Sequence, residues 1–433
     1  MILSKGNPSI RSASSSPMPT VRTSKPRRNP GLILLTAWLL MLGMTVTQAA
    51  DSDRIASLAG DGGVVLRSPD GEDLIKLNPD RPLIPASVLK IPLAHVALDV
   101  LAADFRFETH FYRNSQGDLL IRGLGDPFLV SEEIASIAQR LAAQGLSSVR
   151  RLVMDDSAFE PNPDLPRETT VRDPYGARNG ALAVNFNTVN LDWAANGELI
   201  SAEPQTPLTP LARELGADLQ PGEPQRINVG QNPITGLRQA QQLFRLFLEQ
   251  ADINVTDPDF YHAAVSDDWS LFYNHASSLT LRNNLDGMLR YSNNFIANQV
   301  FLTLGARQHG YPATAEAARQ VLQERLAVLY GPEFGQEPAL LYMREGSGLD
   351  RSQRSTAAAM LRILEVFQPH AELLTEVDGV LRKSGTLTGV YNFAGYIPGP
   401  DGLYPFVILT NQARNHRGEI LQLLQRRVVS NSN

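Results

Sequence analysis

Cysteine is absent from this sequence of 433 residues. Its absence excludes a cysteine nucleophile, a zinc site with thiolate ligands and any disulfide bond. Lysine is scarce, since five of the 39 basic residues are lysine and the other 34 are arginine. Arginine stays protonated in proteins, whereas a buried or crowded lysine can lose its proton and act as a base. Lys90, three residues after Ser87, is therefore a candidate for a chemical role.

An excess of basic residues is lacking too. The formal net charge is -6 and the sequence pI is about 5.7, so we expect no general basic surface and no nucleic-acid partner. The seven histidines are scattered without a metal-binding spacing, and nothing in the sequence requires a metal or a cofactor. We interpret His95 as structural, Asp126 as part of a turn, and Asp155 and Asp156 as residues that orient a loop.

The first fifty residues differ in composition from the rest of the chain. Six basic residues precede an uncharged apolar run of 16 residues, 31–46, which small residues follow. This layout is typical of a secretory signal, with cleavage expected after Ala49. An uncleaved anchor is the alternative, because the run falls just below the usual membrane-spanning length. We therefore expect residues 1–50 to be a leader and signal peptide and the protein to be periplasmic, with peripheral membrane contact left open.

Hydrophobic periodicity divides the remainder into three stretches. Residues 51–104 begin with a hairpin and continue as a helix that starts at Ser87, and residues 105–250 mix strands with amphipathic helices. Residues 251–433 contain long helices, then antiparallel strands and a C-terminal helix. The pattern predicts an α+β protein in which 51–104 and 251–433 form one domain, an antiparallel sheet with helices on its faces. Residues 105–250 are then an inserted α+β domain, in which the proline-rich stretch 202–225 is a loop or a small subdomain.

Three short motifs carry groups capable of catalysis. Ser-x-x-Lys occurs at Ser87 to Lys90, and on a helix these positions share a face, so the amine can reach the hydroxyl. The alternative is a helix cap followed by a solvated lysine. Ser-x-Asn occurs at Ser292 to Asn294 within a helical run, where the alternative is a break between helices capped by serine or asparagine.

The third motif, Lys-Ser-Gly, occupies Lys383, Ser384 and Gly385 and is followed by Thr386 in a strand-like run. A glycine at this point permits close approach of another backbone, as a substrate-binding strand edge requires. The alternative interpretation of this motif is the ordinary start of a β-strand with no functional role.

Each motif alone arises easily by chance, but their combination and order are those of penicillin-binding proteins and serine β-lactamases. The chain resembles the penicillin-binding proteins of the D-alanyl-D-alanine carboxypeptidase/endopeptidase group, the low-molecular-mass class C or peptidase S13 family. The 205 residues between Ser87 and Ser292 suit the long insertion of that family. Further similar stretches are GLGDPFL (123–129), ALAVNFNTV (181–189) and REGSGLDR (344–351).

The sequence departs from the family pattern at three points. Asn293 stands where the family usually has aspartate, and Ser384 stands for threonine, although both replacements keep a hydrogen-bonding side chain. The insertion is short for two extra subdomains, which leaves open whether a smaller nested subdomain exists.

The resemblance implies a serine-type D-Ala-D-Ala carboxypeptidase that acts on peptidoglycan stem peptides through an acyl-enzyme and is acylated by β-lactams, with D,D-endopeptidase action left open. It implies that Ser87 is the nucleophile and that Lys90 accepts its proton, helped by the nearby charge of Lys383. Ser292 would relay a proton to the leaving amine. Asn294 would hold Lys90 and the substrate amide.

The same resemblance implies the substrate-binding groups. Lys383 and the hydroxyl of Ser384 or Thr386 would bind the substrate carboxylate, with Gly385 between them on the strand. The backbone N–H groups of Ser87 and Thr386 would form the oxyanion hole.

Alternative interpretations remain. Tyr291 to Asn293 also matches the Tyr-x-Asn of class C β-lactamases, in which a tyrosine replaces the serine. We call this alignment the tyrosine frame and the Ser-x-Asn alignment the serine frame, and we favour the serine frame. A β-lactamase or esterase on the same scaffold, or a non-catalytic wall-binding protein, are the rival functions. The class A deacylating motif Glu-x-x-Leu-Asn does not follow the helix, so we expect a bound β-lactam to leave slowly.

Overall fold

The computed structural model describes residues 50–161, 163–166, 173–336 and 340–431. The chain divides into two units, 1–50 and 51–433, and all three motifs lie in the second. The predicted signal sequence lies outside the described residues. In the part that is described, no helix has the length and apolarity needed to cross a membrane.

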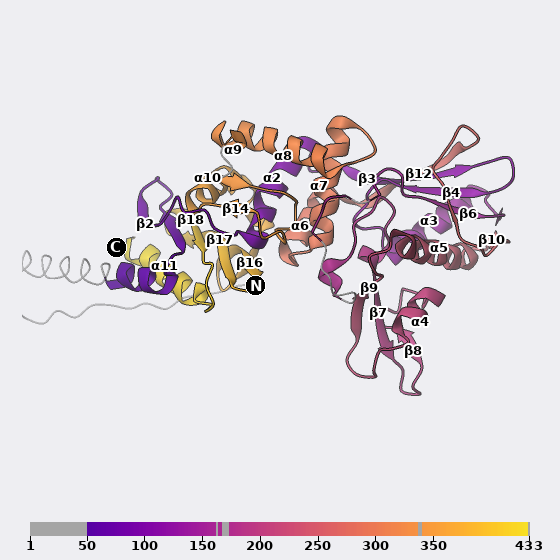
Figure 1. Cartoon of the computed structure of the whole chain (residues 1–433), viewed down its shortest axis with the longest axis horizontal. Helices are drawn as coiled ribbons and strands as arrows, with labels where there is room; N and C mark the ends of the chain where they lie inside the picture. Colours follow the sequence, from indigo (N-terminus) through magenta and orange to yellow (C-terminus); the bar gives the residue numbers. More distant parts are fainter. Residues whose placement is uncertain (1–49, 162, 167–172, 337–339, 432–433) are drawn as a thin grey trace, which may run out of the picture. The chain divides into compact units, whose positions relative to one another are not determined.

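A six-stranded antiparallel sheet joins the two ends of the second unit (Figure 1). The strand order is β15-β16-β17-β18-β1-β2, so the first strand pairs with the last one. This confirms the prediction that N- and C-terminal strands share one sheet. The strands are β1 (Gly63–Arg67), β2 (Asp73–Leu77), β15 (Thr375–Val377), β16 (Val380–Leu387), β17 (Val390–Gly399) and β18 (Gly402–Leu409). The apolar pattern of residues 385–399 predicts a single strand, whereas the structure has the end of β16, a turn and β17 there.

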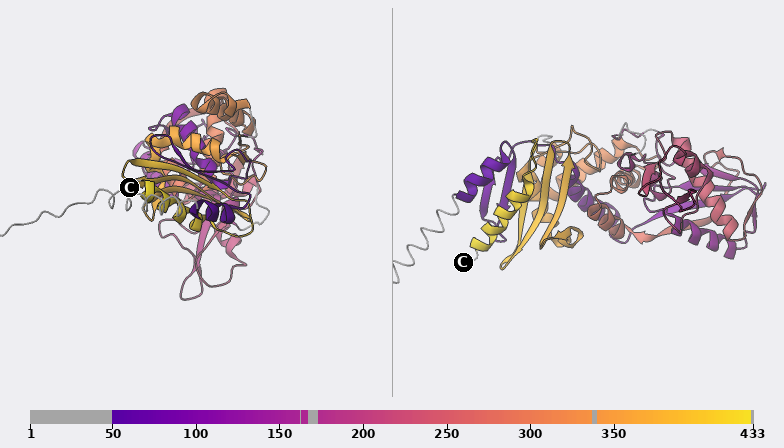
Figure 2. Two further views of the ribbon diagram at one scale, coloured as in Figure 1. Left: turned by 90° about the vertical axis from the view of Figure 1, so that its left-hand side faces the viewer. Right: turned by 90° about the horizontal axis from the view of Figure 1, so that it is seen from below.

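Helices cover both faces of this sheet, as Figure 2 shows for α11 (Arg417–Asn431). Side chains alternate between the faces of a strand, and β18 displays this alternation. Phe406 and Ile408 pack in the apolar cluster with α11, whereas Val407 and Leu409 pack in the cluster on the other face. The helices of that second cluster are α2 (Lys90–Leu101), α6 (Leu281–Arg290), α7 (Asn294–His309), α8 (Ala315–Tyr330) and α10 (Ala357–Phe367).

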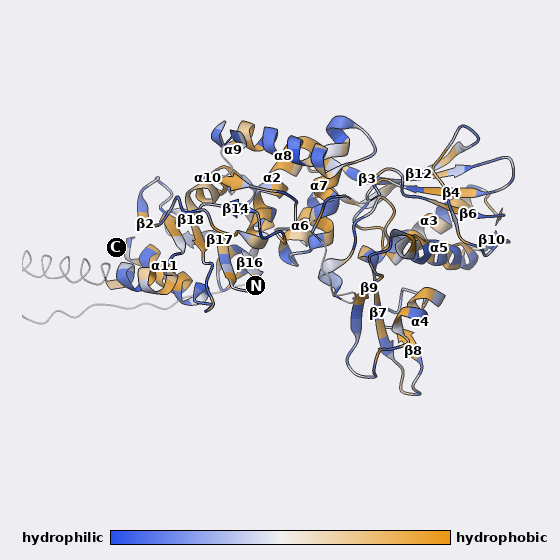
Figure 3. Cartoon of the chain, in the orientation of Figure 1, coloured by the Kyte–Doolittle hydropathy of each residue, from blue (hydrophilic) through white to orange (hydrophobic). Residues whose placement is uncertain are grey.

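The inserted region has its own sheet, ordered β11-β6-β4-β3-β12, and its own apolar core. Its strands are β3 (Arg106–Arg113), β4 (Leu119–Gly123), β6 (Leu152–Asp155), β11 (Tyr261–His262) and β12 (Ser270–Thr280). Helices α3 (Ser131–Ala143) and α5 (Pro233–Gln250) contribute apolar side chains to this core and keep polar residues on their outer sides (Figure 3).

The domain boundary predicted at residue 250 does not coincide with the boundary between the sheets. Both β11 and β12 follow residue 250, yet they pair with β6 and β3 of the inserted region. The inserted sheet therefore ends at Thr280, where the side chain caps α6. Composition gives no sign of this boundary because it is fixed by long-range strand pairing.

A smaller subdomain is nested within the insertion. A three-stranded sheet of β8 (Leu199–Ser201), β7 (Thr188–Trp193) and β9 (Gln225–Asn228) packs with α4 (Pro210–Gly216) around a separate apolar cluster. The nested subdomain that the sequence left open is thus present. The pattern of the stretch 181–195 predicts a pair of strands, whereas the structure has the single strand β7 there.

Candidate active site

Ser87 lies on a tight turn of 3-10 helix, Ala86–Leu89, immediately before α2. The sequence predicted an α-helix starting at this residue, whereas the α-helix begins at Lys90. Two glycines let other segments approach the turn closely. An added Cβ on Gly385 would lie 2.6 Å from the carbonyl oxygen of Pro85, and one on Gly348 would lie 2.3 Å from that of Ala86. Larger residues at either glycine would displace the turn that carries Ser87.

Lys90 is fully buried and contacts three oxygens. Its Nζ lies 3.0 Å from the Ser87 Oγ, 2.8 Å from the Asn294 Oδ1 and 2.5 Å from the carbonyl oxygen of Ser347. A neutral amine has two N–H groups and one lone pair, so it can donate to the two carbonyl oxygens and accept the Ser87 proton. The geometry therefore suits Lys90 as a base toward Ser87.

Burial lowers the pKa of Lys90 well below its ordinary value, and the positive charge of Lys383 lowers it further. The carboxylate of Glu345 acts in the opposite direction and raises this pKa. A lowered pKa is what a lysine needs to be neutral when the nucleophile is activated.

Ser292 lies at a break between α6 and α7 rather than inside a helix. Its backbone has φ of 53°, and the Asn293 side chain caps α7 by accepting a hydrogen bond from the Ile296 N–H at 3.0 Å. The capping alternative is thus correct for Asn293, and asparagine or aspartate can both make such a cap. The break frees the Ser292 hydroxyl to accept a hydrogen bond from Lys383 at 2.8 Å. Tyr291 is 77% exposed, which favours the serine frame over the tyrosine frame.

Lys383 is buried in β16, on the face of the sheet that carries α2. Its Nζ donates to the Ser292 Oγ and, at 2.9 Å, to the carbonyl oxygen of Ser384. Burial lowers its pKa to about 8, with a further contribution from the charge of Arg417. Since β15 pairs only with residues 380–382 of β16, the edge beyond Lys383 is open to an extended peptide.

The residues after Lys383 alternate between the faces of the sheet. Gly385 lies against the Ser87 turn, whereas Ser384 and Thr386 occupy the alternate positions. The Ser384 side chain is half-buried, and the exposed Thr386 accepts a hydrogen bond at its Oγ1 from Arg417 Nη1 at 2.7 Å. The roles of Ser384, Gly385 and Thr386 in binding the substrate carboxylate stay predictions.

Two parts of this site were missed by sequence reasoning. One is Arg417, at the start of α11, which also lies over the Phe393 ring at 4.5 Å. The other is the turn that carries Ser347, although the segment 344–351 resembles the family. Neither has a spacing that points to a catalytic function.

The remaining candidates are structural. The His95 Nδ1 lies 2.6 Å from the Tyr330 hydroxyl in the core, and Asp126 shapes a turn by accepting the Phe128 N–H at 2.8 Å. Asp155 accepts two loop N–H groups, and Asp156 pairs with an exposed histidine. Within the described residues, no group of histidines and carboxylates could hold a metal ion.

A cavity of about 560 Å³ adjoins the site on the side of Ser292 and Asn294. Its lining is largely apolar, and it includes residues of the inserted region such as Phe128 and Phe186. The insertion therefore forms one wall of a space next to the candidate catalytic residues.

The chain is similar in sequence to proteins of one known family. A model of the D-Ala-D-Ala carboxypeptidase 3 (S13) family matches residues 47–213 and 231–378. The D-alanyl-D-alanine carboxypeptidase of Actinomadura sp. strain R39 is 28% identical over 426 residues, which cover 82% of this chain and 78% of that protein. The D-alanyl-D-alanine carboxypeptidase DacB of Haemophilus influenzae is 24% identical over 74% of this chain and 78% of its own length.

The fold has a close counterpart among solved structures. The crystal structure of penicillin binding protein 4 from Haemophilus influenzae superposes with a TM-score of 0.69 at 19% identity, covering 88% of this chain and 98% of that one. The match includes both the sheet domain and the insertion, and the family model spans well over half of the sequence. The chain belongs to the D-Ala-D-Ala carboxypeptidase 3 (S13) peptidase family.

Proposed function

We propose that this serine hydrolase cleaves the terminal D-Ala-D-Ala bond of peptidoglycan stem peptides through an acyl-enzyme on Ser87. Membership of a D-Ala-D-Ala carboxypeptidase family supports the reaction class. The observation that carries the assignment of residues is the buried Lys90 amine, which contacts both the Ser87 hydroxyl and Asn294.

In the proposed mechanism, Lys90 takes the Ser87 proton while Ser87 Oγ bonds to the substrate carbonyl carbon. The C–N bond then breaks, and a proton passes through Ser292 to the leaving D-alanine amine. The Ser87 and Thr386 N–H groups would stabilise the oxyanion, each such donor contributing about 3 kcal/mol to the barrier reduction. Water releases the acyl group. The substrate carboxylate would lie near Lys383.

We also propose that β-lactams acylate Ser87. A penicillin binding protein 4 from Haemophilus influenzae with the same fold has been solved with a bound β-lactam. The test incubates the purified protein with a fluorescent penicillin beside the Ser87→Ala variant. We expect covalent labelling of the wild type alone, and an unlabelled wild type would contradict both this proposal and a β-lactamase function.

Assays of the same purified protein distinguish the rival functions. A β-lactamase would turn over nitrocefin rapidly, whereas a peptidase acylated by β-lactams would release the product slowly. A non-catalytic wall-binding protein would not be labelled at all. The contact of a buried lysine with Ser87 argues against the last possibility, since binding alone requires no base.

Endopeptidase action on cross-linked peptides is an extension of this proposal. The cavity beside Ser292 offers room for a leaving group larger than a single alanine. Mass spectrometry of digested muropeptides distinguishes the two reactions, because carboxypeptidase action removes one alanine and endopeptidase action splits a cross-linked dimer. Peptidoglycan as substrate, and the predicted leader, support a periplasmic location, which fractionation of cells would test together with any peripheral attachment to the membrane.

A further inference from the structure

The turn between β13 (Leu341–Tyr342) and β14 (Arg354–Ser355) reaches the reacting groups through one backbone oxygen. The carbonyl oxygen of Ser347 lies 2.5 Å from the Lys90 Nζ and 3.3 Å from the Ser87 Oγ. The position of this carbonyl therefore determines where the amine sits relative to the nucleophile. None of the three motifs includes this turn.

Side chains hold the backbone of this turn along its whole length. Every N–H group from residue 344 to residue 350 donates to a side-chain oxygen, and the acceptors are Gln353, Asn298, Glu345 and Ser347. Buried N–H groups need partners, and here side chains provide what a helix or sheet provides elsewhere. The conformation of the turn consequently depends on a few side chains.

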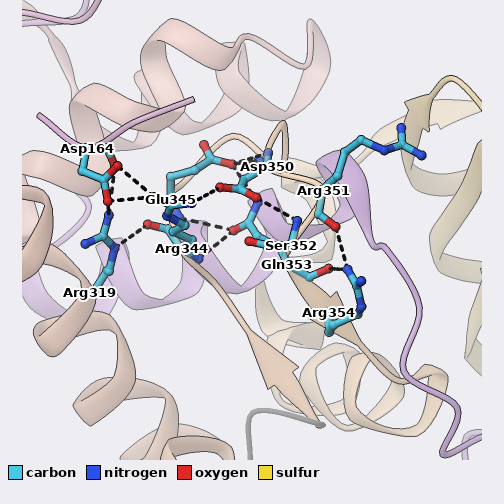
Figure 4. Close-up of polar contacts among 10 residues, drawn as sticks. Asp164, Arg319, Arg344, Glu345, Asp350, Arg351, Ser352, Gln353 and Arg354 are labelled. Atoms are coloured by element: carbon cyan, nitrogen blue, oxygen red, sulfur yellow. Dashed lines mark hydrogen bonds and ion pairs between the residues drawn. The ribbon is translucent and has the colours of Figure 1, made fainter. Parts of the chain in front are cut away.

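Glu345 accepts more of these bonds than any other side chain, three of the seven. Its side chain is fully buried, and its carboxylate accepts from the N–H of Ser347 at 2.6 Å and of Gly348 at 2.7 Å. Gln353 Nε2 donates to the same carboxylate at 2.7 Å, and the two residues face each other in Figure 4. All of these donors are uncharged. A buried carboxylate with uncharged partners is costly unless a cation lies nearby, and the charge of Glu345 acts on Lys90.

We propose that Glu345 is a positioning residue for acyl transfer, which fixes the turn that holds Lys90 on Ser87 and compensates the charge of the ammonium formed there. In this step the Ser87 O–H bond breaks, a new N–H bond forms on Lys90, and Ser87 Oγ bonds to the carbonyl carbon. Glu345 itself exchanges no proton. The inference rests on the proposed function, because it concerns the same acylation.

The expected pH dependence follows from the charges that face Lys90. Lys383 of β16 lowers the pKa of Lys90, and Glu345 raises it. Removing the negative charge lowers this pKa further, so a larger fraction of Lys90 is neutral in mild acid. The acid limb of the acylation rate then moves to lower pH, while the maximal rate falls because the amine is a weaker and less well placed base.

The experiment measures the rate of labelling by a fluorescent penicillin against pH for the wild type and Glu345→Gln. We expect the maximal rate to fall about tenfold or more and the acid limb to move down by about half a pH unit or more. Gln353→Met is the matched control, since it disturbs the same turn without changing charge. It should lower the rate and leave the acid limb in place.

Glu345→Asp keeps the charge and shortens the side chain, so its acid limb should match the wild type at a reduced maximal rate. If Glu345→Gln does not fold, the same comparison is made with Glu345→Asp. Three results would overturn the inference. The acid limb could stay in place in Glu345→Gln, it could move equally far in Gln353→Met, or it could shift in Glu345→Asp. Failure of the wild type to be labelled would instead count against the proposed function.

Discussion

Burial of Lys383 and, to a lesser extent, the charge of Arg417 are expected to set the upper pH limit of acylation. Arg417 contacts Thr386 and lies close enough to Lys383 to lower its pKa, which burial already lowers, to about 8 from an ordinary value of 10.5. Above pH 8, Lys383 loses the positive charge that we propose attracts the carboxylate of a penicillin. The labelling rate of the wild type should therefore decline above about pH 8.

The Arg417→Gln variant tests this reasoning. The difference between 10.5 and about 8 is roughly 2.5 units, and burial is the larger cause, so Arg417 accounts for less than half of it. Removing the charge should raise the pKa of Lys383 by up to about 1 unit, equivalent to about 1.4 kcal/mol of interaction between the two cations. The alkaline limb should accordingly move toward pH 9.

The assay is the second-order rate of labelling by a fluorescent penicillin at constant ionic strength, between about pH 6 and pH 10. Arg417→Lys is the control, because it keeps a positive charge and should keep the wild-type limb. An alkaline limb that stays in place in Arg417→Gln would refute the electrostatic argument. A limb that moves equally in both variants would show that the hydrogen bond to Thr386, rather than the charge, is responsible.

Three other predictions use the same protein. Lys90→Arg keeps the charge but cannot act as a base, so labelling should fall about 100-fold or more; a wild-type rate would exclude Lys90 as the proton acceptor. Ser292→Ala should reduce hydrolysis of a D-Ala-D-Ala peptide about 100-fold while Tyr291→Phe leaves it unchanged, and the reverse result would favour the tyrosine frame. Burial raises the pKa of Asp126 from 3.8 to about 6, so the stability that its protonated form gives is present below about pH 4 and is lost as the pH rises through 6. Asp126→Asn should thus increase the unfolding free energy by up to about 3 kcal/mol more at pH 7.5 than at pH 4, as urea denaturation would measure, whereas an equal change at both pH values would contradict a buried charge.

The proximity of the candidate catalytic side chains could be predicted from the sequence, because the chemistry proposed for them restricts both residue type and spacing. In the structure Lys90 contacts both Ser87 and Asn294, and Lys383 contacts Ser292, so residues of all three motifs come together. The central sheet was also predictable, since alternating apolar strands occur at both ends of the second unit.

What the sequence could not provide depends on contacts between distant segments. Glu345 acts on backbone N–H groups of its own turn, and an acidic residue in a loop has no periodicity to mark it as buried. Arg417 resembles any other arginine until β16 and α11 are packed together. The boundary at Thr280 likewise depends on the pairing of β12 with β3. Local patterns carry no information about such pairings.

The support of the Ser87 turn also bears on when activity can arise during synthesis. The N–H of Ile84 donates to Asn411, and Asn392 donates to the carbonyl oxygens of Ile84 and Pro85. A chain that emerges N-terminus first thus presents its nucleophile about 300 residues before the strands that brace it. The support of the Ser87 turn is therefore incomplete on a nascent or C-terminally truncated chain, and we expect the hydrolase to become active only after its last strands have been made and paired.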